Sequence, residues 1–546
     1  MYGSRTVMAP RGMVTSPHYL ATSAGLHVLE NGGNAIEAAI AVASVIAVVY
    51  PHMNGIGGDN FWLIYDAKRR QVKSLQACGP AGSLCTPQLY ADRGHPNAIP
   101  FRGVLAANTV PGAVDGWSEA YRFSRDKLGG SIEFPVLLQQ AIFYAEFGYP
   151  VSYGQHVWTL HNVGPDSGAL GHLEDFDGFA RTFLKGSGQA YLSGERFKIP
   201  ALAQSLRSIA EGGSEAFYRG PIAEQICAYL SERGGLLTLS DFASYHSRWD
   251  DPISTQYRHW KVYNSPPPTQ GLTSLQILRI IENFPIADWG DDSSLYYHVI
   301  IEATKEAFRD RDMWIGDPNF NDVPVERLLA KKYTKKLAAS IDLSVAKSNV
   351  VTEPGGGDTV WMGIVDKDGN AVSLIQSIYF DFGSGVVVDG TGITLQNRGA
   401  SFSLNNDSVN LIVPGKRPFH TLNPAMALRN GAPELVYGTM GGEGQPQTQA
   451  AILTRILDLG MNVQAAIDAP RWLFGRTWGD ETSTLSVEGR LSNDIVESLL
   501  AKGHDVHVVG DWDERMGHAQ AIWIDPNSGM MHGGADTRGD GLAVGY

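Results

Sequence analysis

A hydroxyl side chain stands one residue after a glycine run, where a strand is expected to begin. Residues 355–358 read GGGD, Thr359 follows, and strand-like stretches cover 359–366 and 371–379. A threonine here suits a self-cleaving precursor. Its hydroxyl attacks the carbonyl of Asp358, the chain breaks, and the new N-terminal amine serves as general base for the same hydroxyl. The alternative is an ordinary hairpin entered through a glycine linker.

The turn between the two stretches decides which residues face each other. A three-residue loop over 367–369, with its glycine left-handed, pairs Asp366 with Asn370. The same register places Thr359 opposite Ser377, with Cβ atoms about 5 Å apart on one face. A two-residue loop would turn Ser377 to the other face. We favour the three-residue loop, because a second hydroxyl there can hydrogen-bond the nucleophile.

The rest of the chain must position this hairpin, and its patterns predict helices and strands in blocks. Helical spacing covers 17–50 with a break at Gly32-Gly33, after which Asn34 can cap a second helix. The polar segment 348–358 is expected to be exposed. An α+β layered body is predicted. Further helices are predicted at 112–123, 134–147, 200–210, 222–234, 272–281, 448–459 and 493–502, and further strands at 61–66, 385–388, 425–429, 434–438 and 520–524.

Composition indicates a globular protein and excludes several classes. The 546 residues are 43% hydrophobic and 18% charged, and the net charge of −14 argues against nucleic-acid binding. The longest apolar run, 35–50, contains Glu37 and is too short to span a membrane. The first 20 residues lack the apolar core of a signal peptide, so a cytoplasmic location is expected. The cysteines, Cys78, Cys85 and Cys227, are too few for a disulfide framework.

Several motifs, in one order along nearly the whole chain, resemble the γ-glutamyltranspeptidase family of N-terminal-nucleophile hydrolases. Three belong to the N-terminal part and three to the C-terminal part. They are GMVTSPHYLATSAGLHVLENGGNAIEAAIAVASVIAVVYP, GIGGDNFWLIYD, NTVPGAVDGW, DTVWMGIVDKDGNAVS, KRPFHTLNPAMAL and MGGEGQPQ.

The resemblance implies a four-layer αββα sandwich, made as one chain and cleaved between Asp358 and Thr359. The large subunit would be residues 1–358 and the small subunit 359–546, with a dimer of such heterodimers as one option. Thr359 would be the nucleophile, and Gly441-Gly442 would form the oxyanion hole. Adjacent glycines let two N–H groups approach the oxyanion, each donor contributing about 3 kcal/mol. A Gly-Gly pair alone more often marks a tight turn.

The residues that this resemblance assigns to a glutamyl head group are mostly replaced. A glutamate substrate needs charged partners at both ends, so efficient glutathione hydrolysis is not expected. The positions are Gln76 in place of arginine, Tyr379 in place of asparagine, Ala400 and Ser401 in place of acidic residues, and His420-Thr421 in place of two serines.

Two other side chains are candidates for substrate binding in place of the missing glutamyl-binding residues. The guanidinium of Arg398 suits a carboxylate, and His420 could donate a hydrogen bond to a second acceptor. The alternatives are an Arg398 that pairs with a surface acid and a His420 that is an ordinary core histidine. Arg417 lies in a motif shared with the family and is interpreted as structural.

These observations predict a self-cleaving threonine amidohydrolase that acts through an acyl-enzyme on a small amide bearing a carboxylate. Oxamate, hydrolysed to oxalate and ammonia, is the favoured substrate. γ-Glutamyl transfer or glutathione hydrolysis is the first alternative, and a glutaryl-cephalosporin acylase is another. A non-catalytic, uncleaved relative is a rival from a different class. The mechanism needs no cofactor and no metal, and no partner other than the small substrate is expected.

Overall fold

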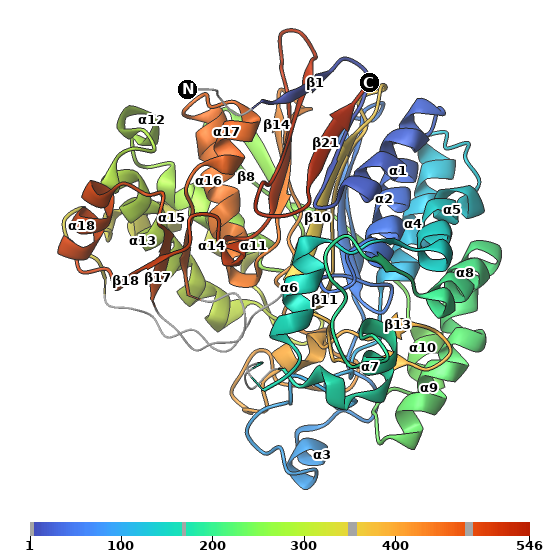
Figure 1. Ribbon diagram of the computed structural model, residues 1–546. Helices are drawn as coiled ribbons and strands as arrows, with labels where there is room; N and C mark the ends of the chain where they lie inside the picture. The colour runs from blue at the N-terminus through green and yellow to red at the C-terminus, as the bar shows by residue number, and fades with distance from the viewer. Residues whose placement is uncertain (1–4, 166, 168–170, 348–357, 476–483) are drawn as a thin grey trace.

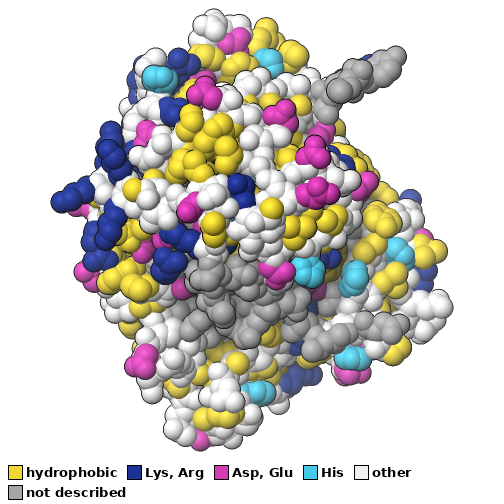
Figure 2. Space-filling model, turned by 90° about the vertical axis from the view of Figure 1, so that its left-hand side faces the viewer, with side chains coloured by type: hydrophobic (Ala, Val, Ile, Leu, Met, Phe, Trp, Pro, Cys, Tyr) yellow, Lys and Arg dark blue, Asp and Glu magenta, His cyan; other side chains and the backbone are white. Residues whose placement is uncertain are grey.

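Two seven-stranded antiparallel sheets form the centre of the protein (Figure 1). The computed structural model describes residues 5–165, 167, 171–347, 358–475 and 484–546, with Asp358 described by its backbone only. The other residues are drawn in grey in Figure 1 and Figure 2. The first sheet contains, in order, β21 (Leu542–Gly545), β2 (Met13–Ser16), β10 (Asp358–Val365), β11 (Ala371–Tyr379), β3 (Asp59–Asp66), β4 (Gln71–Ala77) and β7 (Arg248–Asp250). The second sheet contains β1 (Val7–Ala9), β20 (Met531–Ala535), β19 (Ala519–Ile524), β15 (Ala432–Thr439), β14 (Ala425–Arg429), β9 (Trp260–Asn264) and β8 (Ile253–Tyr257).

Helices cover the outer face of each sheet, which confirms the predicted four-layer αββα sandwich (Figure 1). The first sheet is covered by α1 (Tyr19–Glu30), α2 (Ala35–Val49) and α4 (Ala113–Lys127), with α5 (Phe134–Phe147), α8 (Pro200–Tyr218) and α9 (Pro221–Glu232) beyond them. The second sheet is covered by α11 (Gly271–Ile281), α16 (Gln445–Leu457) and α17 (Val463–Asp468), with α13 (Ser294–Trp314) and α18 (Asn493–Ala501) outside them.

Shorter elements complete the chain around these layers. The helices are α3 (Pro87–Asp92), α6 (Tyr153–His161), α7 (Asp177–Phe183), α10 (Leu239–Ser244), α12 (Ile286–Trp289), α14 (Val325–Leu329) and α15 (Lys331–Ala339). The strands are β5 (Tyr149–Pro150), β6 (Arg196–Phe197), β12 (Val387–Val388), β13 (Ile393–Thr394), β16 (Trp472–Phe474), β17 (Leu485–Glu488) and β18 (Val506–Val509).

Strand alternation divides the core into layers. In β10, Val360, Met362 and Ile364 belong to the cluster under α2, whereas Trp361 and Val365 belong to the cluster between the sheets. Both faces of the strand are therefore buried, which explains why its sequence reads as nearly continuous apolar residues. By the same alternation, Thr359 lies on the face between the sheets.

Most predicted elements are present, and the differences lie at their ends. The residue Asn34 caps α2 through a capping box with Glu37. Helix α16 begins at Gln445 rather than at 448, because Pro446 is favourable in a first helical turn. Helix α8 extends past 210 and has a kink at the non-helical Gly213, after which a second helical stretch runs to Tyr218. The predicted exposed segment, apart from Asp358, lies outside the described residues.

The apolar run that the sequence interpreted as a buried helix is α2, and all of its residues are buried. Across the described ranges, no helix is long and apolar enough to cross a membrane. All three cysteines are buried free thiols, and burial raises the pKa of Cys78 to about 12.

Candidate active site

The β10–β11 hairpin has the predicted turn and register. The Asp366 N–H donates to the Asn370 carbonyl at 3.0 Å, and Gly369 is left-handed with φ 81°. The pairing then continues regularly as far as Val360 opposite Gln376. The three-residue loop is therefore confirmed.

At Thr359 the ladder is interrupted. Asp358 pairs with Tyr379, so two residues of β11, Ser377 and Ile378, stand opposite the single Thr359. The predicted one-to-one pairing of Thr359 with Ser377 is thus replaced by a β-bulge. Bulges bend a strand and redirect side chains next to active sites.

Both hydroxyls at the bulge are buried between the sheets. Thr359 is 0% exposed, and its Oγ1 has no hydrogen-bond partner in the part of the chain that the structure describes. Ser377 accepts a 2.7 Å hydrogen bond from the Tyr379 N–H and pairs with Asp59 of β3 on its other side. An unbonded hydroxyl at a strand start has its lone pairs available for attack.

A buried arginine lies next to the end of β11. The guanidinium carbon of Arg398 is 3.7 Å from the ring centroid of Tyr379, whose backbone has a left-handed φ of 83°. Arg398 Nη2 donates to Thr421 Oγ1 at 3.1 Å, while Nε and Nη1 have no partner among the described residues. Arg398 is 0% exposed, and burial lowers its pKa to about 10. The predicted surface-acid alternative for Arg398 is therefore wrong.

His420 and Asp59 form a second buried pair beside Arg398. The distance from His420 Nε2 to Asp59 Oδ2 is 3.2 Å, and Asp59 Oδ1 accepts from the Gly112 N–H at 2.9 Å. Burial raises the pKa of Asp59 to about 7, against the opposing effects of a Gln396 hydrogen bond and the Arg398 charge. Burial, together with the charge of Arg398, holds the pKa of His420 well below its ordinary value.

The Gly441-Gly442 pair adopts backbone conformations that favour glycine. Gly441 has φ 113° and ψ 36°, and Gly442 has φ 51°. Gly442 opens the 3-10 helix that leads into α16, so the N–H groups of the pair lie at a helix start, where they have no partner within the helix. Such a site favours negative charge, as an oxyanion hole requires.

Packing brings the glycine pair to the start of β10. A Cβ on Gly438, three residues before Gly441, would lie 2.2 Å from Cδ1 of Trp361, which is two residues after Thr359. Gln270 adds a polar link, because its Nε2 donates to both the Thr421 and the Gly442 carbonyls at 2.7 Å.

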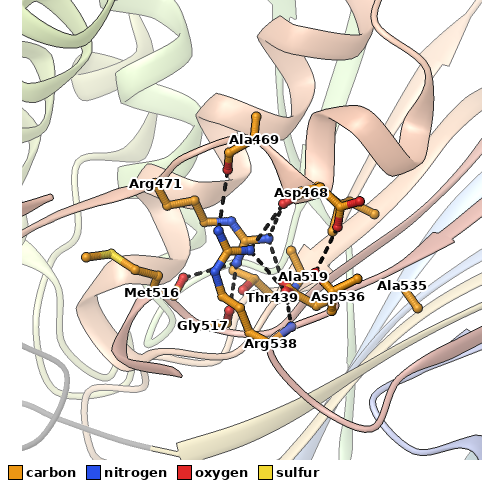
Figure 3. A network of polar contacts seen from close by, with 12 residues as sticks. Thr439, Asp468, Ala469, Arg471, Met516, Gly517, Ala519, Ala535, Asp536 and Arg538 are labelled. Carbon is orange, nitrogen blue, oxygen red and sulfur yellow. Dashed lines mark hydrogen bonds and ion pairs between the residues drawn. The ribbon is translucent and has the colours of Figure 1, made fainter. Parts of the chain in front are cut away.

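A buried ion-pair network holds the loop at Gly517 (Figure 3). Arg471 donates to the Gly517 carbonyl at 2.6 Å and pairs with Asp536, which also pairs with Arg538. A Cβ on Gly441 would lie 3.4 Å from the Cα of Gly517. The network therefore fixes the loop against which the glycine pair packs.

Comparison with known proteins identifies this arrangement. The family model for γ-glutamyltranspeptidase matches residues 21–546. The chain belongs to the γ-glutamyltranspeptidase family. It is therefore an amide hydrolase of the N-terminal-nucleophile type, as the sequence motifs predict.

Relatives within this family carry different names. The oxamate amidohydrolase proenzyme of Klebsiella pneumoniae is 47% identical over 539 residues, covering 99% of each chain. The glutathione hydrolase-like YwrD proenzyme of Bacillus subtilis is 45% identical over 542 residues, covering 99% of this chain and all of the relative. A cephalosporin acylase from Bacillus halodurans has a similar structure, with a TM-score of 0.90 and 38% identity, covering 100% of this chain and 98% of the other.

The two arginines that the sequence singled out in this family member have different surroundings. Arg417 pairs with Asp317 at 2.8 Å and donates to Gln76 Oε1 at 2.8 Å, as expected for a structural residue. The family resemblance implies a substrate-binding arginine at position 76. Gln76 stands there instead and accepts a hydrogen bond from Arg417.

Sequence reasoning missed Asp59 and Gln270, which contact the predicted site residues His420 and Gly442. Asp59 stands in the GIGGDN motif at the start of a buried strand, and a carboxylate at such a position is a signal that could have found it. Gln270 follows a proline-rich connector and gives no comparable signal.

Within the described ranges, one group of side chains has the spacing of metal ligands, namely His298, Glu302 and His504. Its atoms already have protein partners: His298 Nδ1 lies 2.8 Å from His504 Nε2, and Glu302 pairs with Lys305 at 2.8 Å. The group lies at α13 and the loop after α18, outside the second sheet. We assign it no ion.

Proposed function

We propose that this protein is a self-cleaving threonine amidohydrolase that converts oxamate, or a closely similar acid amide, into a dicarboxylate and ammonia. The observation that carries the proposal is Arg398, a buried guanidinium with two unpartnered N–H donor atoms beside the start of β10. A buried charge without a partner is costly, and a substrate carboxylate would supply the missing acceptors.

The surroundings of Arg398 favour an acid amide over a γ-glutamyl group. Asp59, whose charge acts on Arg398, already accepts hydrogen bonds from backbone N–H groups and contacts His420. The positions where the family resemblance implies acidic residues for an α-amino group hold Ala400 and Ser401. A substrate with a carboxylate and no α-amino group fits this set of side chains.

Self-cleavage would generate the active form. Thr359 Oγ1 adds to the Asp358 carbonyl carbon, the C–N bond breaks, and an ester links the two segments. Water then hydrolyses the ester and releases residues 1–358 from residues 359–546, which begin with the Thr359 amine.

Turnover would use the same hydroxyl on the substrate. The Thr359 amine accepts the Oγ1 proton as Oγ1 adds to the amide carbon, and Gly441 and Gly442 donate to the oxyanion. The C–N bond breaks, and ammonia leaves with the proton held by the amine. Water hydrolyses the oxalyl ester, so oxamate and water give oxalate and ammonium. Ser377 would orient the nucleophile.

Intact mass spectrometry with a substrate assay tests this proposal. Wild-type protein is expected to appear as fragments 1–358 and 359–546 and to release ammonia from oxamate. Thr359→Ala should remain one chain without activity, whereas the matched control Thr359→Ser keeps a hydroxyl and should cleave. Cleavage of the Ala variant would refute Thr359 as the nucleophile.

Glutathione hydrolysis is the second candidate, supported by the 45% identity to the glutathione hydrolase-like relative. Glutamate release from glutathione, without ammonia release from oxamate, would select it. Acylase activity on a glutaryl amide can be measured on the same preparation.

A further inference from the structure

We propose that His420 Nδ1 accepts a hydrogen bond from the N–H of the scissile amide, and that this contact makes the enzyme select amides over isosteric esters. The inference rests on the proposed function, because it assumes an acid amide held by Arg398. It differs from the expectation that His420 donates a hydrogen bond to the substrate.

The imidazole is fixed in place by the backbone and by its neighbours. The backbone N–H of His420 donates to the Pro268 carbonyl, and the backbone carbonyl of His420 accepts from the backbone N–H of Gln270, both at 2.9 Å. The ring is 0% exposed and packs edge-on against Phe61, with ring centroids 4.6 Å apart. Because the backbone of His420 and the ring contact with Phe61 hold the imidazole in place, the directions in which Nδ1 and Nε2 point are fixed.

Asp59 determines which nitrogen carries the proton. Burial raises the pKa of Asp59 to about 7, so its carboxylate form predominates at the pH of 8 used in the test below. Its Oδ1 accepts hydrogen bonds from the N–H groups of Gly79 and Gly112, and the positive charge of Arg398 also favours the carboxylate. Since a carboxylate only accepts hydrogen bonds, the contact between His420 Nε2 and Asp59 Oδ2 places the imidazole proton on Nε2. Nδ1 of the neutral ring is then an acceptor.

That acceptor has no partner of its own. His420 Nδ1 is buried and lacks a hydrogen-bond partner among the described residues. The next residue, Thr421, accepts from Arg398 Nη2, so the unpartnered acceptor and the unpartnered guanidinium donors belong to one cluster of contacts. A buried acceptor left without a donor costs about 1–3 kcal/mol.

An acid amide supplies the complementary groups. Its carboxylate accepts from Arg398, its carbonyl oxygen faces the Gly441 and Gly442 N–H groups, and its N–H donates to His420 Nδ1. An ester replaces the N–H by an oxygen with lone pairs, which leaves Nδ1 unpaired. Sites built to hydrogen-bond an N–H group discriminate strongly against analogues that lack it.

The test compares N-methyloxamate with its isosteric ester, monomethyl oxalate, at pH 8. The matched variants are His420→Gln, whose amide can reach Asp59 in the place of Nε2, and His420→Asn, whose Oδ1 can take the place of Nδ1. Uncleaved Thr359→Ala protein gives the spontaneous rate of ester hydrolysis. Self-cleavage of each His420 variant confirms that it has folded.

For His420→Gln we expect kcat/KM to fall about 100-fold for N-methyloxamate and at most about threefold for the ester. Only the amide has an N–H group, so only the amide loses a hydrogen bond in this variant. His420→Asn should keep most of the wild-type amide-to-ester ratio. Equal losses on both substrates would overturn the inference and leave the proposed function intact. Cleaved wild-type protein that hydrolyses neither oxamate nor N-methyloxamate would instead refute the proposed function.

Discussion

Arg398 and Arg417 are both buried near His420, yet only one of them has a complete set of partners. Arg417 uses Nε, Nη1 and Nη2 on Asp317 and Gln76. Arg398 has one hydrogen bond, to the Thr421 hydroxyl, and its Nε and Nη1 are unpartnered within the described chain. Burial lowers the pKa of Arg398, whereas for Arg417 Cys78 and Asp317 outweigh burial and raise the pKa.

Burial of an arginine therefore does not by itself mark a binding site. Arg471 and Arg538 are also buried, and they pair with Asp536 in a network that supports a loop (Figure 3). Paired arginines contribute to the fold, whereas the charge left unpaired is available to a substrate. Replacing each arginine by methionine, an apolar side chain of similar length, separates these roles.

The largest effect on stability is expected for Arg417→Met. The substitution leaves the buried carboxylate of Asp317 without its ion-pair partner, which costs about 3 kcal/mol or more. The urea midpoint for unfolding measures this loss. A midpoint equal to that of the wild type would show that Arg417 is not structural.

Arg398→Met is expected to affect catalysis rather than folding. Loss of one partner of a buried charge pair costs about 3 kcal/mol, so kcat/KM for oxamate should fall on the order of 100-fold. The urea midpoint should not decrease, because no ion pair is broken. If this variant loses as much stability as Arg417→Met, the distinction between the two arginines is wrong.

A smaller effect is expected on how stability depends on pH below 7. Burial would raise the pKa of Asp317, but its hydrogen bonds and ion pair with Arg417 hold that pKa below its ordinary value. Such a group adds stability above its unfolded pKa of about 4, and this stability is lost as the pH falls through the folded pKa. Urea midpoints measured from pH 7 downwards should fall less in Arg417→Met than in the wild type. Parallel curves would contradict this expectation.

The sequence predicted the local elements well, because their signals are short-range. Helix α5 and strand β11 have the predicted bounds, and the turn at Gly369 has the predicted geometry. The bulge at Thr359 was not predicted, because it depends on how the end of β11 continues beyond the regular ladder. Asp59 was missed because its partner, His420, is 361 positions away in the chain.

The family, the four-layer class and the hairpin that presents Thr359 follow from the sequence alone, since motif order, side-chain periodicity and turn chemistry are properties of contiguous residues. Which charges are paired, in contrast, is visible only in the folded protein. Whether Arg398 or Arg417 meets a carboxylate depends on segments far apart in sequence, and their relative placement follows from how both sheets and both helix layers pack together.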